Sequence, residues 1–270
     1  MDPVRNPFAP GAGTPPPELA GRAGIVEDAE VVLQRVRKGR PVQSPILVGL
    51  RGVGKTVLLN RIEPRAQQVG FLTMFVEAHE GKRLPELLVP GLRGLLYRLS
   101  TVEAAKVHAT RAIRVLKAFL GAIKITFNDA NATLGLDPEV GVADSGDLEA
   151  DLPDLIGAVG EAAAAAGRPI CIIIDELQYL RSQEFSALVM SMHRVNQRAL
   201  PMVMIGAGLP HILALAGNSK SYAERLFRFP EIGALAPDDA THAIVAPAHN
   251  EGVKFTDDAV ARILETTQGY

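Results

Sequence analysis

The chain has 270 residues, with 28 lysines and arginines against 30 aspartates and glutamates, which gives a formal charge of −2. Hydrophobic residues make up 47% and charged residues 21%, values typical of a globular protein, so a wholly disordered chain is excluded. The balanced charge gives no general argument for nucleic-acid binding. A single cysteine, Cys171, excludes an internal disulfide framework and a zinc site built from several cysteines.

The apolar runs are much shorter than the roughly 18 residues that a membrane-spanning helix needs. The first seven residues lack the cationic start and apolar core of a secretory signal. We therefore expect a cytoplasmic protein with no membrane partner. The length fits one large α/β domain with an appendage.

The N-terminal part predicts an arm, a helix and a strand in that order. Residues 1–20 contain six prolines and two glycines, which favours an extended arm laid over a domain. Apolar residues recur at helical spacing over 23–38. Residues 46–48 form a short apolar run typical of a buried parallel strand. A Gly-rich turn follows, and 56–65 is expected to be a helix that ends near Pro64.

Two neighbouring segments of opposite charge follow the next predicted strand, which covers 71–76. Residues 82–124 hold nine basic residues against two acidic ones, and their second half predicts an amphipathic helix. A small hairpin is expected over 123–136. Residues 137–154 hold seven carboxylates and no basic residue, which predicts a solvated loop. The basic segment either pairs with this loop, which we favour, or binds nucleic acid or an acidic partner.

The remainder of the chain alternates helices with apolar strands. An Ala-rich helix is expected over 152–166, ended by Gly167. Residues 170–174 are the most strand-like run, and a helix over 183–197 and a strand over 201–205 follow. Such alternation predicts crossover units, and hence a mostly parallel sheet covered by helices on both faces.

One turn of this sequence carries a phosphate-binding pattern. The residues after the first strand are Gly49-Leu50-Arg51-Gly52-Val53-Gly54-Lys55-Thr56, which fit G-x-x-x-x-G-K-[ST]. Glycines let successive N–H groups point at an anion, and the following helix adds its positive dipole end. Lys55 can place an ammonium on the β- and γ-phosphates, and the hydroxyl of Thr56 can ligate Mg²⁺. We expect residues 49–56 and the adjoining Val57 to bind a nucleotide.

A second motif lies at the end of the most strand-like run. This run leads directly into Asp175 and Glu176, and a carboxylate at a strand's carboxyl end shares the sheet edge of the phosphate-binding loop. Asp175 can hold Mg²⁺ through water, and Glu176 can deprotonate an attacking water. The alternative is that two acids merely terminate a buried strand.

Together these motifs resemble those of the AAA+ ATPases, and most closely the branch shared by origin-recognition-type and STAND-like ATPases. The resemblance covers about residue 8 to the C-terminus. It implies a three-layer αβα P-loop NTPase fold with a mostly parallel sheet, followed by the start of a small α-helical lid. It also implies ATP and Mg²⁺ as cofactors. ATP is favoured over GTP because no Asn-Lys-x-Asp segment occurs.

The resemblance extends to residues outside the two motifs. Gly21 and Arg22 resemble a Gly-Arg box that lies against the adenine in that family. The strand at 202–210 resembles the one that carries a polar sensor residue, but Gly206 stands where Asn, Ser or Thr is usual, which puts fast catalysis in doubt. Arg225, or as second choice Arg228, resembles an arginine finger for a neighbouring subunit; a solvated or salt-bridged arginine is the alternative.

These observations divide the chain into three parts. Residues 1–22 form the Pro-rich arm with the Gly-Arg box, and 23–235 form the ATPase core, with an insertion at about 82–154. Residues 236–270 form the beginning of the lid, and we expect the chain to stop before the lid is complete.

The function expected from the sequence is Mg²⁺-dependent ATP hydrolysis that drives or gates a conformational change in a protein client, which the sequence does not identify. Self-association into a ring or filament would accompany the arginine finger. Two alternatives stay open. One is an ATP-gated switch or scaffold that hardly hydrolyses its nucleotide. The other is a DNA-associated motor or loader, although nucleic acid is not the favoured partner.

Overall fold

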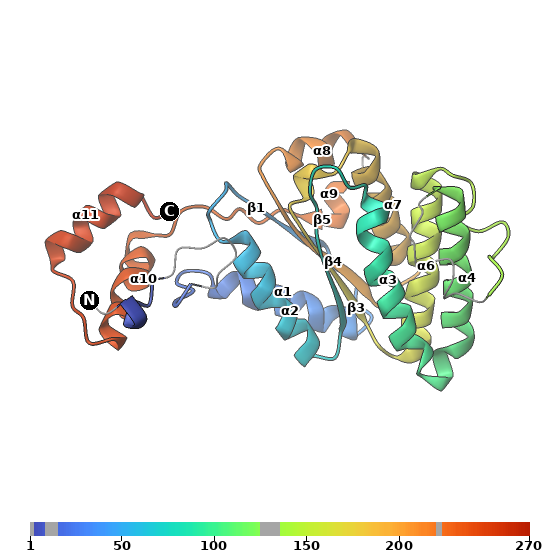
Figure 1. Cartoon of the computed structure of the whole chain (residues 1–270), viewed down its shortest axis with the longest axis horizontal. Helices are drawn as coiled ribbons and strands as arrows, with labels where there is room; N and C mark the ends of the chain where they lie inside the picture. Colours follow the sequence, from blue (N-terminus) through green and yellow to red (C-terminus); the bar gives the residue numbers. More distant parts are fainter. Residues whose placement is uncertain (1–2, 9–15, 125–135, 220–222) are drawn as a thin grey trace.

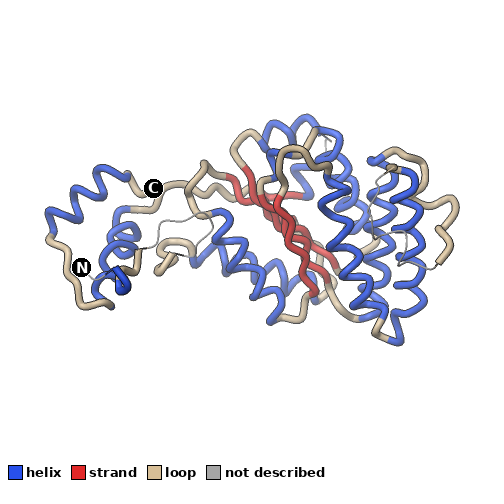
Figure 2. Tube along the Cα trace, in the orientation of Figure 1, coloured by secondary structure: helices blue, strands red, loops and turns tan. Residues whose placement is uncertain are grey.

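The computed structural model describes residues 3–8, 16–124, 136–219 and 223–270. In this part of the chain five strands form one sheet, in the order β2-β3-β4-β1-β5. The strands are β1 (Ser44–Val48), β2 (Leu72–Glu77), β3 (Ile170–Asp175), β4 (Met202–Gly208) and β5 (Phe227–Arg228). All neighbouring strands run parallel, and helices cover both faces of the sheet (Figures 1 and 2). The predicted three-layer α/β fold is confirmed.

The helices form two groups, one on the sheet and one beside the termini (Figure 1). The group around the sheet comprises α1 (Ala23–Arg37), α2 (Lys55–Gln68), α3 (Leu84–Ser100), α4 (Lys106–Ala122), α6 (Leu148–Ala166), α7 (Ser182–Gln197), α8 (Ile212–Ser219) and α9 (Ala223–Leu226). Of these, α4 packs against α3 and α6 rather than on the sheet itself. The lid helices are α10 (Pro237–Asn250) and α11 (Asp257–Thr267). The residues that the structure describes also form three short 3-10 turns, η1 (Pro3–Arg5), η2 (Glu103–Ala105) and η3 (Leu177–Tyr179).

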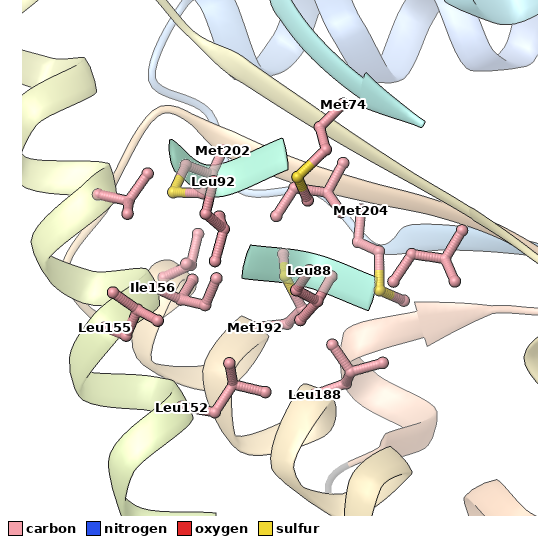
Figure 3. Packing of buried hydrophobic residues seen from close by; sticks show 14 of the residues in the cluster. Met74, Leu88, Leu92, Leu152, Leu155, Ile156, Leu188, Met192, Met202 and Met204 are labelled. Atoms are coloured by element: carbon pink, nitrogen blue, oxygen red, sulfur yellow. The ribbon is translucent and has the colours of Figure 1, made fainter. Parts of the chain in front are cut away.

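The central strands are apolar on both faces because each face packs against its own set of helices. All six residues of β3 are buried. Its Cys171 and Ile173 belong to the core with α1 and α2, whereas Ile172 and Ile174 belong to the core with α3, α6 and α7. On the second face methionines of the sheet interleave with leucines of these three helices (Figure 3). This two-sided burial explains why the strands are continuous apolar runs rather than alternating ones.

Helix α2 does not end near Pro64, as the sequence predicted, but continues to Gln68. Pro64 lacks an N–H, so within the helix the carbonyl of Asn60 loses its usual donor. Both residues are exposed, so water can satisfy that carbonyl. The helix starts at Lys55, directly after Gly54, whose φ of 88° suits glycine.

The acidic segment is only partly the solvated loop that we expected, because α6 begins at Leu148 and contains several of its carboxylates. The Asp147 side chain caps the helix by accepting from the N–H of Glu149 at 3.0 Å. Asp151 is only 2% exposed, and its carboxylate accepts bonds from Ser145 and Gly146. These acids order the junction between loop and helix. At the other end Gly167 has a φ of 61°, which confirms the predicted C-cap.

The basic and acidic segments contact each other, as the favoured interpretation predicts. Arg111 and Arg114 form ion pairs with Glu139 at 3.5 and 3.3 Å. Lys117 Nζ donates to the carbonyl of Leu136 at 2.6 Å. The predicted hairpin over 123–136 lies almost entirely outside the described residues.

Helix α10 starts at Pro237, within the segment 236–270 that the resemblance led us to expect as the beginning of a lid. The N-terminal residues lie against it: Arg5 pairs with Glu251 at 3.2 Å, and the rings of Phe8 and Phe255 are 6.5 Å apart. Among the described residues, no helix combines the length and the hydropathy needed to cross a membrane.

Candidate nucleotide-binding site

The loop between β1 and α2 presents a row of free backbone donors. Within the described structure, the N–H groups of residues 50–54 have no hydrogen-bond acceptor. Gly52 and Gly54 have φ values of 84° and 88°, so the curl of the loop depends on residues without a Cβ. Successive free N–H groups at a helix N-terminus form a concave anion site. The loop therefore has the local structure that phosphate binding requires.

Gly49 at the start of this loop is needed for a different reason, which is close packing. A Cβ at this position would lie 2.2 Å from the carbonyl oxygen of Ile232. That backbone is held against β1 because the N–H of Ile232 donates to the carbonyl of Val48. The first glycine of the motif thus lets residues 231–232 pass beside the loop.

Lys55 points into the loop and is almost fully buried, at 6% exposed. Its ammonium donates to the carbonyls of Gly49 and Leu50 at 2.9 and 2.8 Å. Burial lowers the pKa of Lys55, while the charges of Glu176 and Asp175 oppose that shift. The ammonium of Lys55 thus lies next to the row of N–H donors, and the carboxylates of Glu176 and Asp175 are close enough to shift its pKa.

Thr56, in the first turn of α2, and Asp175, at the end of β3, are in direct contact. The hydroxyl of Thr56 donates to Asp175 Oδ2 at 2.6 Å, and Asp175 is only 1% exposed. Burial raises the pKa of Asp175, opposed by the hydrogen bonds from Thr56 and from the N–H of Glu176. A hydroxyl and a carboxylate so placed are oxygen ligands that suit Mg²⁺.

Glu176 adopts an unusual backbone conformation for a residue with a side chain. Its φ is 55°, in the left-handed region, where it precedes η3. Such conformations persist only where the surroundings impose them, and they concentrate at functional sites. Its carboxylate accepts a hydrogen bond from the side-chain amide of Gln178. The turn thus fixes Glu176 next to Asp175 at the same sheet edge as the phosphate-binding loop.

A cavity of about 160 Å³ adjoins the loop on the side of the lid. It is lined by Gly52, Val53, Gly54 and Val57, by the arm and Gly-Arg box (Pro16, Leu19, Ala20 and Arg22), and by Leu235, Gly269 and Tyr270. Arg22 donates to the carbonyl of Gly233, and a Cβ on Gly21 would clash with Asp239 of α10. The Gly-Arg box therefore lies between core and lid, beside this cavity.

The lining of this cavity shows where the sequence interpretation was incomplete. Val57, which the sequence led us to expect at the nucleotide, lines the cavity together with Gly52, Val53 and Gly54. Leu235 and Tyr270 were not predicted as site residues, although the N–H of Leu235 donates to the carbonyl of Gly269 and holds the chain end there. No local pattern marks these two residues, because only the fold of the lid brings them to the loop.

A second hollow, of about 520 Å³, adjoins the loop at Arg51. Its lining includes Arg51, Glu77, His79, Glu176 and Tyr179. Arg51 donates to the Tyr179 hydroxyl at 3.2 Å, and Glu77 pairs in register with Asp175 on the neighbouring strand. Glu77 could have been found from the sequence, since the carboxyl ends of adjacent parallel strands share one edge.

Gly206 lies within β4, two residues before its end, and is paired in register with Ile174 and Ile46. A Cβ there would be 2.4 Å from Leu177 Cδ1. A larger residue at this position would therefore require the Leu177 side chain to move, and the strand presents no polar side chain at 206.

Arg225 and Arg228 lie away from the loop of their own chain. β5, which contains Arg228, pairs with Ser44 and Pro45 at the beginning of β1, whereas the loop follows its end. Arg228 forms an ion pair with Asp28 at 3.1 Å, as the salt-bridged alternative describes, whereas Arg225 is exposed. Either arginine could therefore contact a nucleotide only if that nucleotide were bound to the loop of a second subunit.

Two solved structures share this fold at low sequence identity. One is the Aeropyrum pernix ORC2 protein in its ADPNP–ADP complexes, with 14% identity, a TM-score of 0.51, and coverage of 87% of this chain and 53% of that one. The other is Cdc6p from Pyrobaculum aerophilum, with 13% identity, a TM-score of 0.52, and coverage of 93% and 54%. The chain thus spans about half the length of each.

No curated protein sequence matches the chain significantly. A family model described as AAA ATPase domain matches residues 18–205, which include the phosphate-binding loop, the acidic strand end and most of the sheet. The chain therefore belongs to the AAA ATPase domain family.

Proposed function

We propose that this chain binds ATP with Mg²⁺ at the loop between β1 and α2 and hydrolyses it. The observation that carries this proposal is the row of N–H groups at 50–54, which find no acceptor among the described residues, bordered by Lys55 and by the Thr56–Asp175 pair. An anion site, a buried cation and a pair of oxygen ligands for a divalent cation occur together at one sheet edge. Membership of the AAA ATPase domain family supports the same activity.

The triphosphate would lie along residues 49–56, with its β- and γ-phosphates near Lys55. The ammonium would exchange the carbonyls of Gly49 and Leu50 for phosphate oxygens, which are stronger acceptors because they are charged. The base would enter the 160 Å³ cavity between the Gly-Arg box and Tyr270. Thr56 and Asp175 would hold Mg²⁺, which supplies positive charge to the phosphates when bound.

Glu176 would act as the general base. It would take one proton from a water whose oxygen bonds to the γ-phosphorus, while the bond from that phosphorus to the β–γ bridging oxygen breaks. The products are ADP and inorganic phosphate. Hydrolysis would drive or gate a change in a client, and the lid beside the base cavity is the part of this chain placed to move with the nucleotide.

A slow, ATP-gated switch is the second candidate, and Gly206 is the observation that favours it. The strand offers no polar side chain at 206 to contact a γ-phosphate or the attacking water. Binding would then be intact while turnover is low.

The two further alternatives concern partners. Self-association would place the exposed Arg225 at a neighbour's nucleotide, whereas Arg228 is already paired with Asp28. DNA binding has less support, because Arg111 and Arg114 of the basic segment pair with Glu139. DNA affinity measured against salt concentration tests this alternative, since phosphate contacts give a steep dependence and a flat response would exclude it.

Hydrolysis is tested by phosphate release from the wild type and from Glu176→Gln, with nucleotide affinity measured for both. We expect similar affinity and a turnover at least about 100-fold lower in the variant, as for loss of a general base. Equal residual rates would favour the switch and reject the hydrolytic role of Glu176.

A further inference from the structure

The carboxyl end of β4 consists of small residues without polar side chains. Its last three residues are Gly206, Ala207 and Gly208. Gly206 is in register with Ile174, the residue before Asp175, and Gly208 is in register with Val48, the residue before the phosphate-binding loop. This strand therefore reaches the sheet edge between the two motifs with no polar side chain on its last three residues.

Side chains of η3 occupy the space that these glycines leave. Leu177 lies over Gly206, where a Cβ would be 2.4 Å from its Cδ1. Gln178 lies over Gly208, where a Cβ would be 3.4 Å from its Oε1. The two glycines and the two η3 side chains thus fit one another, and Gln178 brings an amide to the place where the strand has none.

Both ends of the Gln178 amide are hydrogen-bonded. Its Oε1 accepts from the N–H of Leu209 at 3.1 Å, and its Nε2 donates to Glu176 Oε2. Only an amide combines a carbonyl acceptor and an N–H donor at this reach, since Glu lacks the donor when ionised and Met lacks both. One side chain therefore links the carboxylate of Glu176 to the backbone just beyond β4.

We infer that Gln178 is a positioning residue that holds the carboxylate of Glu176 for water activation and so takes the place of a polar side chain on β4. The inference deepens the proposed function and rests on it, because it assigns Gln178 to the same hydrolytic step. The left-handed turn at Glu176 fixes the backbone, and the Gln178 amide fixes the carboxylate. Gln178 itself takes no proton and forms no bond to the nucleotide.

This role separates turnover from nucleotide binding. Gln178→Met keeps the length and most of the volume of the side chain over Gly208 but loses both hydrogen bonds. We expect kcat to fall about 10- to 100-fold, as for partial loss of a general base, with an unchanged KM for ATP. Gln183→Ala, at an exposed glutamine in the first turn of α7, is the matched control and should leave kcat unchanged.

Gln178→Glu tests the electrostatic part of the inference. A second carboxylate beside Glu176 disfavours the ionised base, so the acid limb of kcat against pH should move to higher pH. A role confined to packing predicts a lower melting temperature with unchanged kcat and pH profile for the folded enzyme.

Two different results overturn the inference and separate it from the proposed function. Wild-type kcat and a wild-type pH profile in Gln178→Met and Gln178→Glu, with turnover still dependent on Glu176, reject the role of Gln178 alone. Equal rates in the wild type and Glu176→Gln reject the hydrolytic function and the role of Gln178 with it. Circular dichroism of each variant confirms that the rates compare folded proteins.

Discussion

The hydrogen bond between Thr56 and Asp175 can be removed with little change of shape by Thr56→Val. The bond is 2.6 Å long and is made to a carboxylate that is 1% exposed, so water cannot readily replace the lost donor. Hydrogen bonds to charged groups contribute about 1.5–3 kcal/mol to stability. In a chain of this size 1 kcal/mol corresponds to about 2–4 °C in melting temperature, so we expect a decrease of roughly 3–12 °C.

The decrease should depend on pH in a defined direction. Burial raises the pKa of Asp175 in the folded chain, so ionisation costs stability as pH rises from the ordinary value of an aspartate to the raised one. The Thr56 hydrogen bond opposes this shift, and its removal raises the pKa further. The stability gap between wild type and Thr56→Val should therefore be widest where Asp175 is ionised and should narrow as acid protonates it.

Thermal unfolding between pH 5 and 8 measures this gap, with Thr56→Ser as the control that keeps the hydroxyl. Isothermal titration of ATP with Mg²⁺ or with EDTA supplies the second readout, because the proposal makes Thr56 a metal ligand. Thr56→Val should lose most of the gain in affinity that Mg²⁺ confers. A wild-type melting temperature at pH 8 together with an unchanged Mg²⁺ effect would refute the reasoning.

Three further substitutions test other parts of the account. Asp175→Asn should stabilise the nucleotide-free chain by about 0.5–2 kcal/mol, as is common when a functional group is removed from a destabilised site. This gain in stability should shrink as pH falls, because a protonated Asp175 no longer carries the cost of a buried charge; thermal unfolding of both proteins across pH measures the gain. Glu184→Ala should lower the free energy of unfolding in urea by about 2–5 kcal/mol, because the buried Glu184 carboxylate accepts from the N–H groups of Leu84 and Arg181 at 2.8 and 2.9 Å. Glu184→Gln should cost less, and a Glu184→Ala protein as stable as the wild type would contradict the role of those hydrogen bonds. Gly49→Ala should cost about 2–3 kcal/mol by forcing a Cβ against the Ile232 carbonyl, whereas Gly24→Ala in α1, where a Cβ meets nothing within 4 Å, should be neutral or stabilising in the same unfolding assay.

The central strands could be predicted from the sequence because burial on both faces makes them uninterrupted apolar runs. The position of the candidate site could be predicted for the same reason, because the loop at 49–56 and the two acids Asp175 and Glu176 directly follow apolar runs of this kind. β5 was not predicted as a strand. It is only two residues long at the sheet edge, and its pairing with Ser44 and Pro45 is not encoded in any local pattern.

The incomplete predictions share a physical cause, which is that burial decides the role of a polar residue. Asp151 belongs to an acidic stretch that looks solvated, yet its carboxylate is buried and satisfied by Ser145 and Gly146. Tyr270 is nearly 100 residues from Asp175 in sequence and meets the loop only through the fold of the lid. The prediction at Pro64 was wrong because α2 continues past this residue, where the carbonyl that the proline leaves without a donor is exposed to water.

The central claim is that the loop at 49–56 binds a nucleoside triphosphate, and the affinity of ATP for wild type and Lys55→Ala tests it most directly. Loss of the buried ammonium removes charge-assisted contacts of about 3 kcal/mol, which corresponds to about 100-fold in affinity. Lys38→Ala, at an exposed lysine after α1, should bind as the wild type does. We predict micromolar binding by the wild type and at least 100-fold weaker binding by Lys55→Ala, as expected for that loss. Equal binding in both, at millimolar affinity or weaker, would contradict the account.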